Sequence, residues 1–407
     1  MTKKSSTPAI RFKGFTDTWE QRKLGDIVER VVRKNTNNES SLPLTISAQY
    51  GLVDQITYFN NRVASRDVSN YYLVLNGEFA YNKSTSDGFP FGAVKRLDLY
   101  EKGVLSTLYI VFTPKKEQQI DSDFLTVFFD TDRWHKGVAE RAAEGARNHG
   151  LLNISAEDFF DIDLSVPKDV AEQKQIGAFI RQLDNLITLH QRKYDKLTNV
   201  KKSMLEKMFP KNGSNVPEIR FKGFTEAWEQ RKLGELALFN PKDELPQTFE
   251  YVDLESVVGT EMLSHRTEVK SSAPSRAQRL AHTGDLFYQT VRPYQKNNYL
   301  FEKPDNNYVF STGYAQMRPY VDGYFLLSLV QSKRFIKVVL DNCTGTSYPA
   351  INANDLAEIE VAAPSDESEA QKIGTIFRSI DNLITLHQRE LEKLKNLKKA
   401  CLEKMFV

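Results

Sequence analysis

The sequence predicts a mixed α/β protein of the α+β kind, with two globular blocks, two long helices and an internal duplication. The order of its repeats carries this prediction. Residues 10–27 return as residues 219–236 with 14 of 18 positions identical, and residues 176–209 return as residues 373–406 with 22 of 34 identical. The blocks between these repeats match each other only faintly. Two similar scaffolds that carry two different blocks predict a pseudo-two-fold arrangement. Such an arrangement suits the recognition of two different targets at a fixed separation.

Length and composition fit two globular domains with cores of their own. The chain has 407 residues, of which 40% are hydrophobic and 11% aromatic. We expect four regions. Residues 1–154 hold the first short repeat and first block, 155–212 a central helical region, 213–351 the second short repeat and second block, and 352–407 a C-terminal helical region.

Composition also restricts the function. The N-terminal residues have no signal-like apolar stretch, and no window approaches 18 apolar residues, so we expect neither secretion nor a membrane span. Cys343 and Cys401 lie far apart, which fits free thiols in the cytoplasm. The net charge of +2 is too small to indicate nucleic acid by itself. A DNA-binding surface must therefore come from local arrangement.

Both blocks combine short aromatic and β-branched runs with one helical stretch. The expected strands of the first block are Tyr72–Leu75, Phe79–Tyr81 and Tyr109–Phe112, and its helix spans Thr126–Ala143. The expected strands of the second block are Leu286–Tyr288, Tyr308–Phe310 and Gln316–Arg318, and its helix spans Phe325–Leu340.

Loops between these elements combine basic, amide, hydroxyl and aromatic side chains with glycine. They span residues 81–96 and 141–150 in the first block, and 288–299 and 344–350 in the second. Such side chains contact phosphates and base edges in DNA. Taken singly, each loop is equally compatible with an ordinary solvated surface.

The long repeats show apolar residues at alternating spacings of four and three, which is typical of a coiled coil. Each helix has one apolar stripe and needs a partner. We expect the two copies to pair, and we favour an antiparallel pair with the blocks at opposite ends. The leading stripe positions are Ile176, Ile180, Leu183, Ile187 and His190 in the first copy, and Ile373, Phe377, Ile380, Ile384 and His387 in the second.

Four polar residues interrupt the stripes. His190 and His387 fit a register-fixing role better than a metal site, because neither has a second ligand one turn away. Lys201 and Lys398 are expected to extend out of the stripe toward solvent.

The sequence lacks the signatures of an autonomous enzyme. Residues 240–243 read NPKD and resemble the start of a methyltransferase loop, but Lys242 and Asp243 cannot stack on a flipped base. We find no glycine-rich cofactor loop, no ATP-binding loop and no metal-ligand spacing among the six histidines. We therefore expect no catalysis, no metal site and no cofactor in this chain.

Three motifs together resemble one family. They are the repeat GFTDTWEQRKLGDI (residues 14–27), the pair LLNISAEDFFDIDLSVP (151–167) and YPAINANDLAEIEVAAP (348–364), and the QKIG-type start of the long helices. With their interleaved order, which covers nearly the whole chain, they resemble the specificity subunit of type I restriction-modification systems.

The resemblance implies two target-recognition domains, each reading one half of a bipartite target in double-stranded DNA. It implies that the helical regions set the spacing and dock two modification subunits, so the stripe residues are also docking candidates. These partners would use S-adenosylmethionine for adenine N6-methylation, and restriction subunits would add Mg- and ATP-dependent translocation and cleavage. A protein–protein adaptor on the same duplicated scaffold, with no affinity for DNA, remains the alternative.

Within the resemblance, loop residues of both blocks are the expected DNA contacts. In the first block they are Asn82, Lys83, Ser84, Lys95, Arg147, Asn148 and His149. In the second they are Arg292, Tyr294, Lys296, Thr346, Ser347 and Tyr348.

Overall fold

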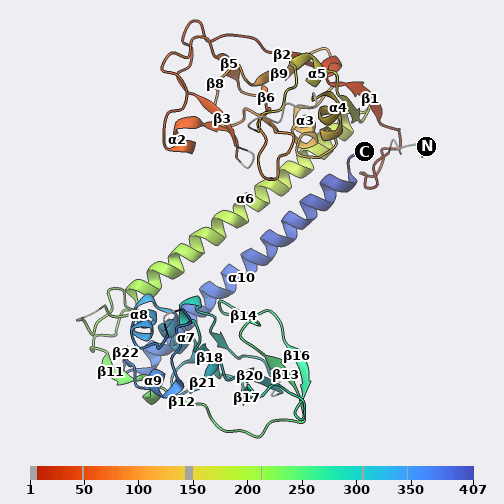
Figure 1. The fold of residues 1–407 in the computed structure, drawn as a ribbon. Helices are drawn as coiled ribbons and strands as arrows, with labels where there is room; N and C mark the ends of the chain where they lie inside the picture. Colours follow the sequence, from red (N-terminus) through yellow and green to blue (C-terminus); the bar gives the residue numbers. More distant parts are fainter. Residues whose placement is uncertain (1–6, 48–49, 143–149, 212, 305–306, 346) are drawn as a thin grey trace. The chain divides into compact units, whose positions relative to one another are not determined.

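The structure is a computed structural model, and it describes residues 7–47, 50–142, 150–211, 213–304, 307–345 and 347–407. The chain forms two compact units, which we call unit 1 (Met1–Leu189 with Glu390–Val407) and unit 2 (His190–Arg389). Two long helices, α6 (Val170–Lys207) and α10 (Glu367–Lys404), each contribute residues to both units (Figure 1).

The shorter elements of unit 1 precede α6. They are β1 (Glu20–Lys23), α1 (Leu24–Ile27), β2 (Val28–Arg30), β3 (Leu44–Ser47), β4 (Gly51–Asp54), α2 (Gln55–Phe59), β5 (Tyr72–Leu75), β6 (Phe79–Asn82), β7 (Ala93–Arg96), β8 (Lys102–Leu105), β9 (Ile110–Pro114), α3 (Ser122–Phe128), α4 (His135–Arg141), α5 (Ala156–Phe160) and β10 (Asp163–Val166).

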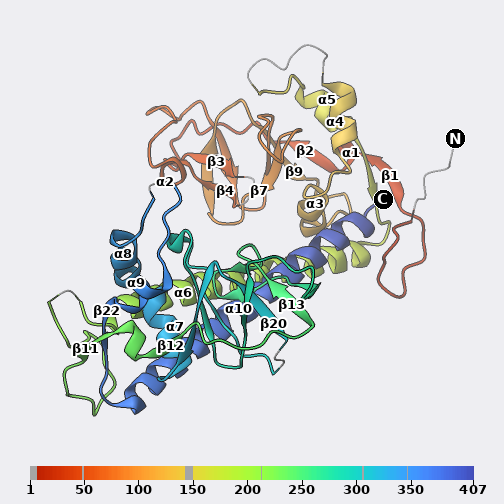
Figure 2. The ribbon, with the colours of Figure 1, turned by 60° about the horizontal axis from the view of Figure 1, so that its bottom comes forward.

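The shorter elements of unit 2 follow α6 and precede α10 in the sequence. Figure 2 shows many of them from a second side. They are β11 (Glu229–Lys232), η1 (Leu233–Glu235), β12 (Ala237–Phe239), β13 (Thr248–Val252), β14 (Val257–Val258), β15 (Glu261–Met262), β16 (Arg266–Val269), β17 (Ala277–Leu280), β18 (Leu286–Gln289), η2 (Pro293–Gln295), β19 (Tyr299–Leu300), β20 (Tyr308–Ser311), β21 (Tyr314–Pro319), α7 (Gly323–Gln331), α8 (Lys333–Asp341), α9 (Ala353–Ala357) and β22 (Glu360–Ala363).

Each unit contains a four-stranded sheet of the same strand order, and the units differ in the strands added to it. A four-stranded antiparallel sheet of order β2-β9-β6-β7 in unit 1 matches the order β12-β21-β18-β19 in unit 2. Unit 1 adds the pairs β3–β4 and β5–β8, whereas unit 2 adds the sheet β16-β13-β20-β17, in which β13 and β20 are parallel. The two blocks therefore share one sheet architecture although their sequences match only faintly, and the added strands distinguish them.

The short repeats close both units in the same way. β1 pairs with β10 in unit 1, and β11 pairs with β22 in unit 2. Just before these strands, Arg11 binds the buried carboxylate of Glu172 through two hydrogen bonds of 2.5 and 2.8 Å. Arg220 binds Glu369 in the same manner, at 2.6 and 2.8 Å. The short repeat is thus fixed to the first turn of a long helix in each unit.

The aromatic residue that follows each long helix packs into a core that also contains the N-terminal turns of the other long helix. Phe406, which follows α10, packs edge-on against Trp19 of unit 1, with ring centroids 6.0 Å apart. Phe209, which follows α6, packs against Trp228 of unit 2 at 5.9 Å. Aromatic residues buried in this way contribute much of a core's stability. The similarity of the long repeats therefore reflects equivalent packing in the two cores.

The predicted stripe is confirmed, since all the stripe positions named above are buried or partly buried. In unit 2, His190 lies beside His387 and Lys201 beside Asp381, so the two helices run antiparallel there, as predicted. In unit 1, Lys398 pairs with Asp184.

The prediction that both lysines extend to solvent is wrong. Lys201 Nζ lies 2.6 Å from Asp381 Oδ1, and Lys398 Nζ lies 2.7 Å from Asp184 Oδ1. The two pairs are equivalent under the repeat, and each joins one helix to the other. Opposite charges at matched positions fix the register of paired helices, so these lysines serve the pairing.

The predicted strands are confirmed as β5, β6, β9, β18, β20 and β21, but each predicted long helix of a block is broken in two. In unit 1, Thr131 accepts a hydrogen bond from the backbone of Arg133 and separates α3 from α4. In unit 2, Ser332 adopts an extended conformation and caps α8 through the backbone N–H of Phe335. Hydroxyl side chains compete with the helix for backbone groups in this way.

No helix in the part of the chain that the structure describes is long and apolar enough to cross a membrane.

Candidate nucleic-acid interface

The structure brings the two candidate loops of unit 1 together. Ser84, just after β6, forms an isolated bridge with Leu151, and Thr85 N donates to Gly150 O at 2.6 Å. Lys83 adds a bond from Nζ to the Ile154 carbonyl at 3.3 Å. The predicted residues Lys83 and Ser84 therefore lie at the junction of the two loops.

The first loop of unit 1 closes tightly on itself. Asn82 Oδ1 accepts a hydrogen bond from Ser84 N at 3.0 Å. At the far end of the loop, Gly92 has a φ of 77°, and a Cβ atom there would lie 2.1 Å from the Asn82 carbonyl oxygen. Only glycine fits this approach. The loop thus has a fixed base from which its exposed residues project.

Lys95 has a structural partner. Its ammonium lies 2.7 Å from Asp130 Oδ1, and Asp130 also lies 3.5 Å from Lys398 Nζ. Its predicted contact with DNA would compete with this pair. Arg147, Asn148 and His149, the other predicted contacts of unit 1, lie outside the described residues.

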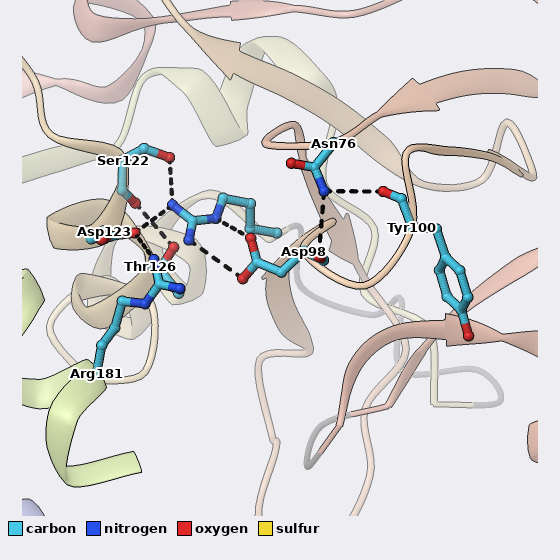
Figure 3. Close-up of polar contacts among 8 residues, drawn as sticks. Asn76, Asp98, Tyr100, Ser122, Asp123, Thr126 and Arg181 are labelled. Carbon is cyan, nitrogen blue, oxygen red and sulfur yellow. Dashed lines mark hydrogen bonds and ion pairs between the residues drawn. The ribbon is translucent and has the colours of Figure 1, made fainter. Parts of the chain in front are cut away.

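Arg96, the neighbour of Lys95, is buried and binds a cluster of partly exposed polar side chains, among them Asp98, Ser122 and Asp123, which Figure 3 labels. Its guanidinium contacts Asp98 at 2.6 Å, and Asp123 and Ser122 at 2.8 Å. Arg181 of α6 reaches the same Asp123 carboxylate at 2.5 Å. Burial opposes ionisation of Asp123, but the two guanidiniums hold its pKa below the usual value. This cluster joins the sheet to α3 and α6, so it supports the loops.

In unit 2, the structure again joins the two candidate loops. Thr344 and Ala350 exchange backbone hydrogen bonds of 2.9 and 3.0 Å, and Arg292 N donates to Pro349 O at 2.8 Å. The Arg292 guanidinium lies 4.6 Å from the centre of the Tyr348 ring. The predicted residues Arg292 and Tyr348 therefore form one stacked pair, drawn from loops more than fifty residues apart.

The rest of the unit 2 prediction divides into exposed and anchored residues. Tyr348 is 64% exposed and Tyr294 49% exposed, and Ser347 is also exposed, whereas Thr346 lies outside the described residues. Lys296 instead donates from Nζ to the Gln331 carbonyl, the last of α7, at 2.8 Å. Burial lowers the pKa of Lys296, and the positive charges of Lys333 and Lys201 lower it further. Lys296 thus anchors its loop to α7.

A polar cavity that the sequence did not suggest lies behind these loops of unit 2. Its volume is about 380 Å³, and Arg279 of β17 lines it together with residues of both candidate loops. From sequence alone, an arginine in a strand is predicted to be an ordinary surface residue. Its neighbours in space depend on the fold and cannot be inferred from the residues beside it in sequence.

The two histidines of the stripe face each other, with 3.1 Å between their Nδ1 atoms. Burial lowers the pKa of His387, and electrostatic repulsion from the neighbouring His190 and Lys193 lowers it further. Across the described ranges, no three or more His, Cys, Asp or Glu residues gather as metal ligands.

Both long helices also carry exposed apolar residues away from the stripe. In unit 1 these are Leu186, Leu189 and Leu397, which we call patch 1. In unit 2 the equivalent set is Leu383, Leu386 and Val200, which we call patch 2. Members of the two patches are related by the repeat offset of 197 residues.

These features define a class of protein: one scaffold built twice, with a different pair of loops on each copy. Comparison with known families agrees. Residues 16–199 and 225–396 match the type I restriction modification DNA specificity domain. The chain belongs to this family, and it is a specificity subunit of a type I restriction-modification system with two DNA-specificity domains.

Individual relatives extend over almost the whole chain. The MjaVIII specificity subunit of Methanocaldococcus jannaschii is 23% identical over 411 residues, which cover 94% of this chain and 91% of the relative. A putative MjaX specificity subunit from the same organism is 22% identical with the same coverage. The crystal structure of a type I S subunit from M. genitalium is similar in fold, with a TM-score of 0.57, 15% identity and coverage of 98% and 99%.

Proposed function

We propose that the chain reads a bipartite target in double-stranded DNA, with one half-site for each unit, and that it performs no catalysis itself. The observation that carries this proposal is the loop junction found in both units. In each, the loop after a central strand of the shared sheet lies against the loop before a short helix. The scaffold is common, but the side chains at the junction differ. Two readers of this kind suit two different half-sites.

The chemistry of the unit 2 junction favours DNA over another ligand. A guanidinium donates to phosphates and to the O6 and N7 atoms of guanine, and an exposed tyrosine offers a hydroxyl to the backbone. Arg292 and Tyr348 present both groups from one stacked pair. Because the chain carries only a net charge of +2, such local groups must supply the attraction.

We further propose that patches 1 and 2 dock two modification subunits, one for each patch. Their exposed apolar residues lie at equivalent positions of the long repeats, so two copies of one partner can bind equivalently. Exposed apolar patches of this kind mark interaction sites. The partners would hold S-adenosylmethionine and methylate adenine at N6. Restriction subunits would bring Mg, ATP, translocation and cleavage.

A binding experiment tests the proposal. The chain, assembled with its modification subunits, is titrated with a duplex that carries the two-part target found by mapping methylated adenines. We expect tight, salt-dependent binding that weakens when the gap between the half-sites changes. Methyl transfer or cleavage by the isolated chain would contradict the non-catalytic role. Absence of any DNA binding by the assembled complex would favour the adaptor alternative.

A further inference from the structure

The cavity of unit 2 is built from polar side chains supplied by several elements. Thr290 follows β18, Asn240 follows β12, and Thr344 and Asn342 follow α8. Ile351 N donates to Thr290 O at 3.1 Å, which joins the cavity wall to both candidate loops. The cavity therefore opens within the proposed DNA-reading region.

Arg279 is a cation that lines this cavity, and no residue that the structure describes forms an ion pair with it. Within the described residues, its side chain makes no hydrogen bond or ion pair, and its Nε atom is buried without a partner. Arg318 in the same unit, by contrast, binds Asp285 at 2.9 Å. Burial lowers the pKa of Arg279, as expected for a partly desolvated cation that no ion pair compensates.

The backbone and the neighbouring acid both leave Arg279 available. The pairing of β17 with β20 shifts register between Ala277 and Arg279, and such irregularities re-aim a side chain. Asp355 also lines the cavity, but its Oδ2 atom accepts a hydrogen bond of 2.6 Å from Asn352 Nδ2. Arg279 is partly buried with its Nε atom enclosed, and desolvating a guanidinium is costly unless an anion joins it.

We propose that this cavity binds one phosphate of the DNA backbone and that Arg279 neutralises it. The inference rests on the proposed function and names a contact within it. Hydroxyl and amide side chains are common phosphate partners, and Thr312 and Asn240 line the cavity, whereas the Thr290 hydroxyl donates to the Gly313 carbonyl at 2.8 Å. Phosphates project outward from a duplex, whereas base edges lie on the groove floor. An arginine that lines a cavity therefore suits a phosphate, and Arg292, stacked on the exposed Tyr348 ring, suits a base edge.

The test compares Arg279→Gln with Arg276→Gln, which removes the same charge from an exposed position three residues earlier. Both variants are assembled with the modification subunits and titrated with the target duplex over a range of salt concentrations. We expect Arg279→Gln to bind roughly tenfold more weakly at ~0.1 M salt and to lower the salt slope by about one. The weakening should be equal for duplexes with altered half-sites. Arg276→Gln should change neither quantity.

Thermal unfolding of the free chain separates binding from folding. Because Arg279 lacks a partner among the described residues, Arg279→Gln should keep the wild-type Tm or raise it. Arg279→Lys, which keeps the charge, should retain the wild-type salt slope. Wild-type affinity in Arg279→Gln, a lower Tm that accounts for its weaker binding, or a loss confined to one base pair would each overturn the phosphate site. If the wild-type complex itself bound no DNA, the proposed function would fail first.

Discussion

The arginine side chains of this chain differ in function according to what lies opposite them. Arg11, Arg220 and Arg96 face carboxylates and hold elements together. Arg292 lies over an exposed ring, and Arg279 lines a cavity. A guanidinium that already has a carboxylate partner stabilises the fold, whereas one without such a partner can meet an external anion.

The buried pairs make a stability prediction. Arg220→Met leaves the Glu369 carboxylate buried and unpaired, which should lower the free energy of unfolding by roughly 3–5 kcal/mol. Adding Glu369→Leu should restore part of it. Stability should be restored more fully in Arg11→Met with Glu172→Leu. Glu369→Leu also removes the acceptor of Trp228 Nε1, whereas Trp19 Nε1 has no partner among the described residues to lose. Urea unfolding of the four variants measures this, and equal restoration in both units would contradict it.

Arg292 makes a prediction about recognition. Arg292→Gln keeps a side chain at a position whose φ is 53° but removes the guanidinium above Tyr348. We expect a loss of about 1–3 kcal/mol in binding, confined to the half-site read by unit 2. Competition between duplexes altered in one half-site at a time provides the measurement. Lys337→Gln, which removes an exposed charge from α8, is the control and should leave both half-sites unaffected.

At the scale of elements, local sequence predicts strands well and loop contacts poorly. The aromatic residues of β6 and β18 favour a strand within a few residues of sequence. The ion pair of Lys95 and the anchor of Lys296 depend on Asp130 and Gln331, each about 35 residues away in sequence. Arg279 was missed for the same reason, because its isolation depends on the whole fold of unit 2.

The long helices make a prediction about assembly. Leu186→Ser with Leu189→Ser removes most of patch 1, while the stripe residues stay intact. Because patch 2 is unchanged, we expect the variant to bind one modification subunit instead of two, with at least tenfold weaker binding at the altered patch. Native mass spectrometry gives the stoichiometry. Asn185→Ser with Thr188→Ser, at exposed neighbours, should still bind two. Loss of both partners from the leucine variant would contradict independent docking.

At the scale of the whole molecule, the paired long helices α6 and α10 should set the gap between the half-sites of the DNA target. The cross-helix pairs Asp184–Lys398 and Lys201–Asp381 fix the helix register. A heptad should therefore be added to both helices, by duplicating residues 194–200 and 391–397, which lie between the paired positions. Each helix lengthens by ~10 Å, so we expect a gap longer by about one to three base pairs with unchanged half-sites. An active variant with the original gap would exclude the helices as the ruler.

The central claim is that each unit reads its own half-site, and mapping methylated adenines in cells tests it most directly. Residues 28–153 replace residues 237–350, so that both scaffolds carry the first block between the shared repeats. The chain is expressed with its modification subunit, and its target is compared with that of the wild type. We expect the asymmetric target to become two inverted copies of the first half-site. A methylating variant that kept the second half-site, or changed the first, would contradict it.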